Sequence, residues 1–316
     1  MRTFLSDNHD ADPQVKMRAG LNLPHLAKED PLHRLLAPVY GAASTSLTRE
    51  EREMRFALWP AQFHCLTQVQ IFQSASIAQQ QGILHAIHVA LLQEAYFIEK
   101  LGMAFGAKML LLSESTEERL LYSSLIADES QHLTSVGQFL ESSEKQNSQN
   151  PFHRLLAEII DYSDRPTLLF VIQVLLEGWG LTHYKSLSSH CAHPHLQTIF
   201  NEILIDEARH HGSGRVLLKQ QQLEAQSIEH CKLALFELFQ MVRQGPQMIV
   251  QAIENELGEL TPSDKRIVFE ELNSFTQTQQ KLDTLKNLVA VEETHQLLRW
   301  CEENHLFQPL PAKDCV

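Results

Sequence analysis

The pattern Asp-Glu-x-x-His occurs twice in the chain, at residues 128–132 and 206–210. On a helix, residues three apart lie on one face about one turn apart, so the Glu and the His of each copy can bind the same metal ion. The Glu-x-x-His spacing alone is not specific, because two further Glu-His pairs near the C-terminus share it. The preceding Asp distinguishes these two copies, which contain the only Asp-Glu dipeptides in the sequence. We therefore expect each copy to supply half of a metal site.

The two aspartates have an expected role of their own. A metal-bound imidazole needs an acceptor for its other ring nitrogen, and a carboxylate on a facing helix is a common one. Asp128 is expected to orient His210, and Asp206 to orient His132, across the interface between the two motif helices. Arg209, inside the second motif, would neutralise one of these aspartates.

A site assembled from two such halves is completed by a carboxylate from each of two further helices. Ahead of the second motif, residues 168–176 are almost wholly apolar, and Glu177 directly after them is the only acid of that stretch. A lone carboxylate is costly to bury without a partner. Glu177 is therefore predicted to be a ligand.

Ahead of the first motif there are two candidates, Glu94 and Glu99. Glu94 falls in the vacant place of a heptad-like apolar stripe, whereas Glu99 adjoins Lys100 at the edge of that stripe. The stripe consists of Ile87, Leu91, Ile98, Leu101 and Phe105. Periodicity thus favours Glu94 and leaves Glu99 as the alternative, with a surface ion pair as its other explanation. The predicted ligand set is Glu94, Glu129, His132, Glu177, Glu207 and His210.

The order Glu, Glu-x-x-His, Glu, Glu-x-x-His over residues 76–220 resembles the ferritin-like di-iron carboxylate superfamily, and above all its oxygen-activating, ribonucleotide reductase-like branch. The Asp before each Glu and the Arg inside the second motif are similar to those of soluble di-iron monooxygenases and acyl desaturases. The resemblance implies that Glu129 and Glu207 bridge two metal ions, with Glu94 and His132 completing one ion. Glu177 and His210 would then complete the other.

Two tyrosines could approach such a site, since Tyr122 lies two turns before Glu129 and Tyr184 two turns after Glu177. In a radical-forming ribonucleotide reductase subunit, which the resemblance includes, either could store a radical. The alternative is that both pack in the core with hydrogen-bonded hydroxyls.

The resemblance implies an enzyme, a non-haem oxidoreductase that holds two iron ions, or manganese and iron, and takes dioxygen as co-substrate. Its expected reaction is hydroxylation, as in a monooxygenase, or desaturation or N-oxygenation, on a small apolar or amphipathic organic substrate. A reductase or ferredoxin would donate electrons. The alternative is a metal-binding ferritin-like protein that acts in ferroxidation, storage or radical generation. The sequence leaves the substrate, the electron donor and the choice between iron and manganese open.

The composition predicts an all-α protein, because Gly and Pro number only 12 each and alternating strand-like runs are absent. We expect a ferritin-like four-helix bundle at residues 76–222, preceded by an arm with short helices at 1–75. Its helices should cover about residues 77–108, 116–141, 166–188 and a segment opening at Pro194. A helical extension at 223–316 should pack on the bundle, as two or three helices over about 227–257 and 263–305.

Partners and compartment follow from charge and cysteine usage. The net charge of -13 disfavours nucleic acid and anionic membrane as partners. No apolar run reaches the roughly 20 residues of a membrane span. Five scattered cysteines and a start without a signal-peptide pattern favour a reduced, cytoplasmic protein, and a homodimer could form through the C-terminal extension.

Overall fold

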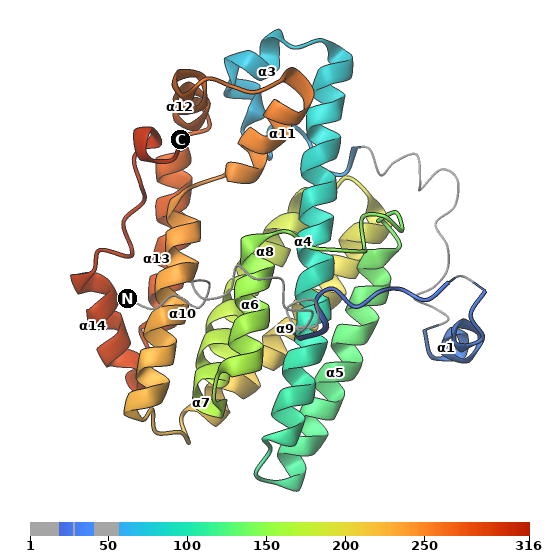
Figure 1. Ribbon diagram of the computed structural model, residues 1–316, viewed down its shortest axis with the longest axis vertical. Coiled ribbons are helices and arrows are strands. Elements are labelled where there is room, and N and C mark those ends of the chain that lie inside the picture. The colour runs from blue at the N-terminus through green and yellow to red at the C-terminus, as the bar shows by residue number, and fades with distance from the viewer. Residues whose placement is uncertain (1–18, 28, 41–56) are drawn as a thin grey trace, which may run out of the picture.

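The computed structural model describes residues 19–27, 29–40 and 57–316. Every regular element over these ranges is a helix and none is a strand (Figure 1), so the predicted all-α class is confirmed. The rest of the predicted N-terminal arm, at residues 1–18, 28 and 41–56, lies outside the described residues. Among the helices of the described part, none is long and apolar enough to cross a membrane.

The first two long helices pack side by side. Helix α4 spans Ile77–Leu111 and α5 spans Thr116–Gly137. At the start of α4, the Ser76 hydroxyl accepts the Gln79 backbone N–H, and the Gln79 side chain accepts the Ser76 backbone N–H. Ser115 caps α5 with its hydroxyl. The short link between the helices makes them antiparallel neighbours.

The second pair consists of α8 (Glu177–His190) and α9 (Pro194–Leu218). A short helix α7 (Arg165–Leu168) and a π-helical segment η4 (Leu169–Leu176) precede α8. The sequence pattern predicted a helix over about residues 166–188 here, and the structure divides this stretch into α7, the π-helical segment and α8. In a π-helix the hydrogen bonds join residues five apart rather than four, which takes up an extra residue per turn. Glu177 is the first α-helical residue after this segment.

The four helices that contain the predicted ligands pack together. Helix α5 contacts both α4 and α9, and α9 contacts α8 and the π-helical segment η4. Helix α6 (Pro151–Tyr162) lies against α4 and connects the two pairs. The two Asp-Glu-x-x-His motifs therefore lie on two neighbouring helices, α5 and α9 (Figure 1).

The C-terminal helices form a further layer against this group (Figure 1). Helices α10 and α13 contact one another, with α10 against α6 and α13 against α8, while α11 crosses α4. The predicted helix over 263–305 is in fact divided, first at Asn273, whose φ of 52° is left-handed. The bounds are α10 Ala225–Arg243, α11 Gln247–Leu257, α12 Pro262–Glu271, α13 Ser274–Val289 and α14 His295–Glu303.

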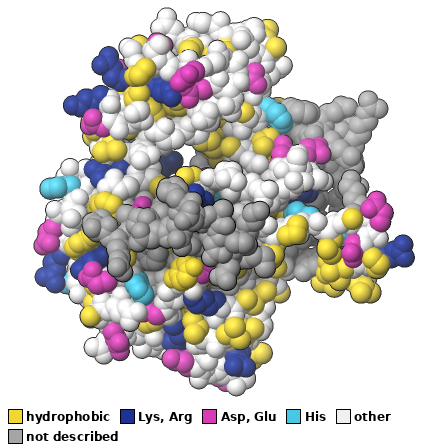
Figure 2. Space-filling model, viewed as in Figure 1, with side chains coloured by type: hydrophobic (Ala, Val, Ile, Leu, Met, Phe, Trp, Pro, Cys, Tyr) yellow, Lys and Arg dark blue, Asp and Glu magenta, His cyan; other side chains and the backbone are white. Residues whose placement is uncertain are grey.

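Part of the N-terminal arm lies along α4. The Tyr96 hydroxyl is 3.0 Å from His25 Nε2, and Lys100 Nζ donates to the Leu23 carbonyl at 3.2 Å. Helix α1 (Leu32–Tyr40) stands apart from the main body (Figure 1). Its hydrophobic side chains, Leu35 and Val39 among them, form an exposed group on the face seen in Figure 2.

Candidate metal centre

Six acidic and imidazole side chains converge between the four packed helices. Five of them come from the sequence-predicted set, and the sixth comes from α4. All are buried except Glu177, which is half-buried. They are Glu99 on α4, Glu129 and His132 on α5, Glu177 on α8, and Glu207 and His210 on α9.

The side chains form two overlapping groups. One ligand atom from each of Glu99, Glu129, His132 and Glu207 lies within 4.8 Å of the others, and the same holds for Glu177, Glu207 and His210. Glu207 belongs to both groups. The groups also meet at Glu129, whose Oε1 is 3.2 Å from His210 Nδ1. Carboxylates and imidazoles in such proximity could bind a metal ion.

The preference for Glu94 as the α4 member of this cluster is corrected by the structure, which places Glu99 there instead. The Glu94 carboxylate is 30 % exposed, and its Oε1 lies 3.8 Å from His183 Nε2 on α8. Glu99 is 1 % exposed, and its Oε2 lies 3.1 Å from His132 Nδ1.

Helix α4 has two apolar stripes rather than one, which explains the correction. The stripe used for the prediction is largely buried, but so is a second stripe with the same heptad spacing. It consists of Leu92, Ala95, Glu99, Gly102 and Gly106. A Cβ on Gly106 would lie 2.7 Å from Ile126 of α5, and one on Gly102 would lie 2.6 Å from Glu129 Oε2. The second stripe therefore faces the cluster, and its small residues were the signal that could have identified Glu99.

Both histidines are held from outside the cluster by the aspartates of the opposite motif. His132 Nε2 lies 3.2 Å from Asp206 Oδ2, and His210 Nε2 lies 3.1 Å from Asp128 Oδ2. These are the two cross-helix pairings expected from the sequence. Arg209 contacts both aspartates, at 2.6 Å and 2.9 Å. Because each Nε2 has an acceptor, the Nδ1 atoms are the ones that face the carboxylates and could bind metal.

Weakening one of these pairings should weaken metal binding. In Asp206→Asn the amide can still accept the His132 proton, but the negative charge that makes the imidazole a better ligand is lost. We expect metal affinity to fall about 10–100-fold. Calorimetric titration with Fe(II) under anaerobic conditions measures this, with Glu202→Gln, an exposed site on the same helix, as the control. Equal affinities for the two variants would contradict the assigned role of Asp206.

The metal-free cluster concentrates negative charge in a buried place. Burial, together with the charges of Glu99 and Glu207, raises the pKa of Glu129 well above its usual range. Burial and the charges of Glu207 and Glu99 do the same to the pKa of Glu177. Burial and the charge of Glu99 raise the pKa of Glu207 to about 8. Without cations, this cluster therefore retains protons that ordinary carboxyl groups lose at neutral pH.

His132 and Glu99 form the one strong ion pair of the cluster. Burial lowers the pKa of His132, but the hydrogen bond to Glu99 and its charge outweigh burial and raise that pKa to about 9. Burial raises the pKa of Glu99, but the hydrogen bond from His132 and its charge outweigh burial and lower it. The proton on His132 Nδ1 thus lies where a metal ion could take its place.

Two further observations fit a metal-binding role. The Glu177 Oε2 atom is buried and has no hydrogen-bond partner, and His210 Nδ1 forms no hydrogen bond although Glu129 Oε1 lies 3.2 Å away. Buried polar atoms are nearly always satisfied, so each such atom calls for an explanation. Gly102 supplies the second observation, since any side chain there would occupy the space of the Glu129 carboxylate. Glu129 therefore has room to extend into the cluster.

The two predicted tyrosines differ in their relation to the cluster. The Tyr184 hydroxyl donates a short hydrogen bond to Glu99 Oε1, so Tyr184 touches a candidate ligand directly. The Tyr122 hydroxyl donates to Gln173 Oε1 at 3.0 Å. Both tyrosines are buried, and burial raises the pKa of each above its usual range.

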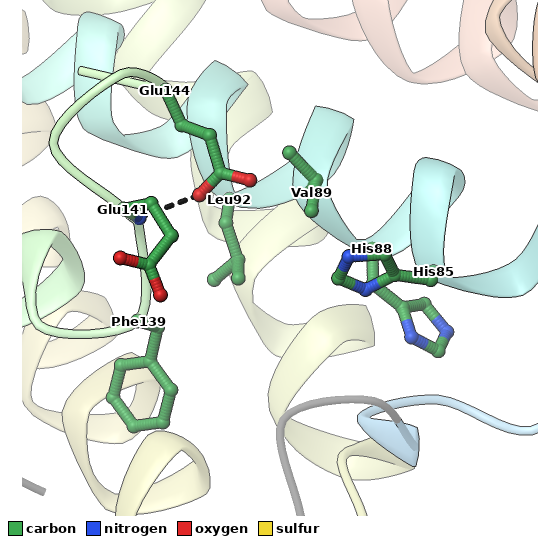
Figure 3. A pocket seen from close by; sticks show the side chains of 7 residues that line it. All are labelled: His85, His88, Val89, Leu92, Phe139, Glu141 and Glu144. Carbon is green, nitrogen blue, oxygen red and sulfur yellow. Dashed lines mark hydrogen bonds between the residues drawn. The ribbon is translucent and has the colours of Figure 1, made fainter. Parts of the chain in front are cut away.

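A separate cavity of about 80 Å³ lies between α4 and the loop after α5. Figure 3 shows the rings of His85 and His88 at one end and the carboxylates of Glu141 and Glu144 at the other. His88 Nε2 donates to the Trp59 carbonyl at 3.0 Å. The centroid of the His64 ring lies 5.6 Å from that of His88. Burial and the charge of His88 lower the pKa of His64 to about 3, and burial lowers that of His88 to about 4.

These buried histidines should make stability depend on pH. The pKa of His88 is about 4 in the folded chain against 6.5 when unfolded, so the unfolded state binds the proton first. The stability that neutral His88 contributes is present above pH 6.5 and is lost as pH falls toward 4. As pH falls through that window, the free energy of unfolding of His88→Gln should therefore rise relative to that of the wild type by about 1.4 kcal/mol per pH unit. Urea unfolding at several pH values tests this, with the exposed site in His190→Gln as control. A difference in free energy of unfolding between His88→Gln and the wild type that does not change with pH would contradict this prediction.

No protein-family model, no curated protein and no solved structure matches the chain. What the chain has is an all-α architecture with a buried cluster of carboxylates and imidazoles that could bind a metal ion.

Proposed function

We propose that the protein is a ferritin-like di-iron, or manganese–iron, oxidoreductase that uses dioxygen to oxidise a small apolar or amphipathic organic substrate. The observation that carries this proposal is the pair of overlapping ligand groups that share Glu207. One group contains His132 and the other His210, and each histidine is backed by an aspartate. Two such groups in contact are the arrangement expected of a dinuclear site.

The ligand set suits the proposed metals. Hard carboxylate oxygens with imidazole nitrogens favour iron or manganese over softer ions. Four carboxylates, from Glu99, Glu129, Glu177 and Glu207, would balance the charge of two divalent ions. Bound iron or manganese would supply the electrons that reduce dioxygen and the oxidising power that acts on the substrate.

The chain itself would hold the ligands, exclude water and place the substrate. The hydrogen bond from Tyr184 fixes the Glu99 carboxylate, and the Asp128 and Asp206 pairings fix the two imidazoles. The Phe170 and Val174 side chains of η4, ahead of Glu177, are fully buried in an apolar core. Such surroundings are compatible with an apolar or amphipathic substrate and disfavour a highly charged one.

Anaerobic loading with Fe(II), followed by exposure to dioxygen, tests the proposal. An oxidase or oxygenase should consume dioxygen repeatedly when a reductant and a suitable substrate are present. A ferroxidase or storage protein should consume dioxygen only in proportion to the iron supplied. A wild-type chain that binds no iron or manganese would exclude both.

A second candidate function, radical generation, is supported by the contact between Tyr184 and Glu99. Bound metal would supply the oxidant for such a radical, and Glu99 would accept the proton of the Tyr184 hydroxyl that is hydrogen-bonded to it. A tyrosyl radical signal in electron paramagnetic resonance after exposure to dioxygen, absent in Tyr184→Phe, would favour this function. Its absence from the iron-loaded wild type would favour the oxygenase.

A further inference from the structure

Gln173 is a polar side chain in an otherwise apolar segment. It lies in the middle of the π-helical segment η4, and every other residue of that segment is aliphatic or aromatic. Its exposed fraction is 0 %. An amide in such a place is unfavourable unless its hydrogen-bonding groups are satisfied.

The amide of Gln173 is satisfied by groups on two of the metal-centre helices. Its Oε1 accepts from the Tyr122 hydroxyl on α5 at 3.0 Å. Its Nε2 donates to the His210 carbonyl at 3.1 Å and to Ser213 Oγ at 3.0 Å, both on α9. The Ser213 hydroxyl also donates to the His210 carbonyl, at 2.8 Å. The side chain thus joins η4 to α5 and α9.

Helix α9 is shaped to receive this side chain. A Cβ on Gly214 would lie 2.7 Å from Gln173 Cγ, so any larger residue would displace the glutamine. Gln173 also lies four residues, about one helical turn, before Glu177. The same side chain therefore links the segment that precedes the Glu177 helix to the backbone of His210.

We propose that Gln173 is a positioning residue for one half of the metal centre, the half formed by Glu177, Glu207 and His210. By joining η4 to the His210 backbone, it keeps Glu177 and His210 at a separation that one metal ion can span. The other half, formed by Glu99, Glu129, His132 and Glu207, is not hydrogen-bonded to Gln173 in any contact described above. This inference rests on the proposed metal centre and predicts that the two halves respond differently to changes at Gln173.

The test is an anaerobic titration of the full chain with Co(II), followed by calorimetry and by visible absorption, which reports on cobalt coordination. The wild type should bind two equivalents. Gln173→Met keeps the approximate volume but removes all three hydrogen bonds, and it should bind one equivalent as the wild type does. The second equivalent should bind about 10–100-fold more weakly, with a changed spectrum. The exposed-site variant Gln251→Met should behave like the wild type.

The outcomes separate this inference from the proposed function. A wild type that binds no cobalt, iron or manganese would overturn the proposed function. If the wild type binds two equivalents of Co(II) and Gln173→Met binds both with unchanged affinity, only the positioning role of Gln173 would be overturned. Equal weakening of both equivalents would also overturn it, since that result indicates general destabilisation. If Gln173→Met does not fold, Ser213→Ala, which removes one partner of Gln173 and of the His210 carbonyl, gives the same comparison.

Discussion

Replacing Glu207 by Ala should abolish the binding of one metal ion and weaken the binding of the other, whereas most other single ligand changes should affect one ion more than the other. Glu207 is the one side chain that belongs to both ligand groups. Its removal leaves Glu177 and His210 with too few partners to form a site, and it takes a carboxylate from the group around His132. Glu207 itself is only 6 % exposed.

Metal content measured by plasma mass spectrometry on protein expressed with iron and manganese checks this expectation. The wild type should contain about two ions per chain, the number implied by the two overlapping groups. Glu207→Ala should contain at most one, while Glu202→Ala, at an exposed position on the same helix, should match the wild type. Because Glu207 carries a raised pKa without metal, the variant should fold at least as well as the wild type. Two ions retained in a folded Glu207→Ala would rule out the shared-ligand arrangement.

The second large effect should distinguish Glu99 from Glu94, five residues apart on α4. Glu99→Gln preserves size but removes the charge that pairs with His132 and the oxygen that a metal would bind. Loss of an outer partner of a ligand typically costs 10–100-fold in affinity, so loss of the ligand itself should cost more than about 100-fold. Glu94→Gln changes only a partly exposed carboxylate beside His183, and its metal affinity should equal that of the wild type.

The two variants form a matched pair, since both replace Glu by Gln on the same helix. Anaerobic Fe(II) titration followed by calorimetry measures both affinities, and thermal unfolding checks that both chains fold. Tyr184→Phe serves as a further control, because Glu99→Gln also alters the hydrogen bond from Tyr184. If Glu94→Gln lost metal and Glu99→Gln kept it, the α4 ligand would be the one that the heptad-like stripe favoured, and the cluster described above would be the wrong one.

Much of the site is local in the sequence. The i and i+3 spacing places each Glu and His on one helix face, whatever the rest of the fold does. The cap residues Ser76 and Ser115 fix where α4 and α5 begin, because their hydroxyls satisfy backbone N–H groups that the helix leaves free. Glu177 was predicted as a ligand because it is the lone acid after an apolar run, and burial of an unpaired charge is costly. These features were predictable from the residues alone.

The choice between Glu94 and Glu99 was decided only by the tertiary structure. Helix α4 is covered on more than one side, by α5, α6 and α11, so two stripes of the same period are buried. Periodicity therefore cannot tell which stripe faces the cluster of carboxylates and imidazoles. The π-helical segment before Glu177 likewise was not predicted from its apolar sequence, and Gln173 within it contacts residues of α5 and α9 that are far away in the chain.

The sequence by itself thus determined the all-α class and both motifs. It also predicted the pairing of each histidine with the opposite aspartate, which the contact between α5 and α9 brings about. Tertiary packing decided which α4 carboxylate completes the cluster and how the Glu177 helix is held beside α9. The physical reason is the separation along the chain of the residues that interact. Helix periodicity and capping act over a few neighbouring residues, whereas the facing stripe and the π-helical register depend on residues far apart in the chain.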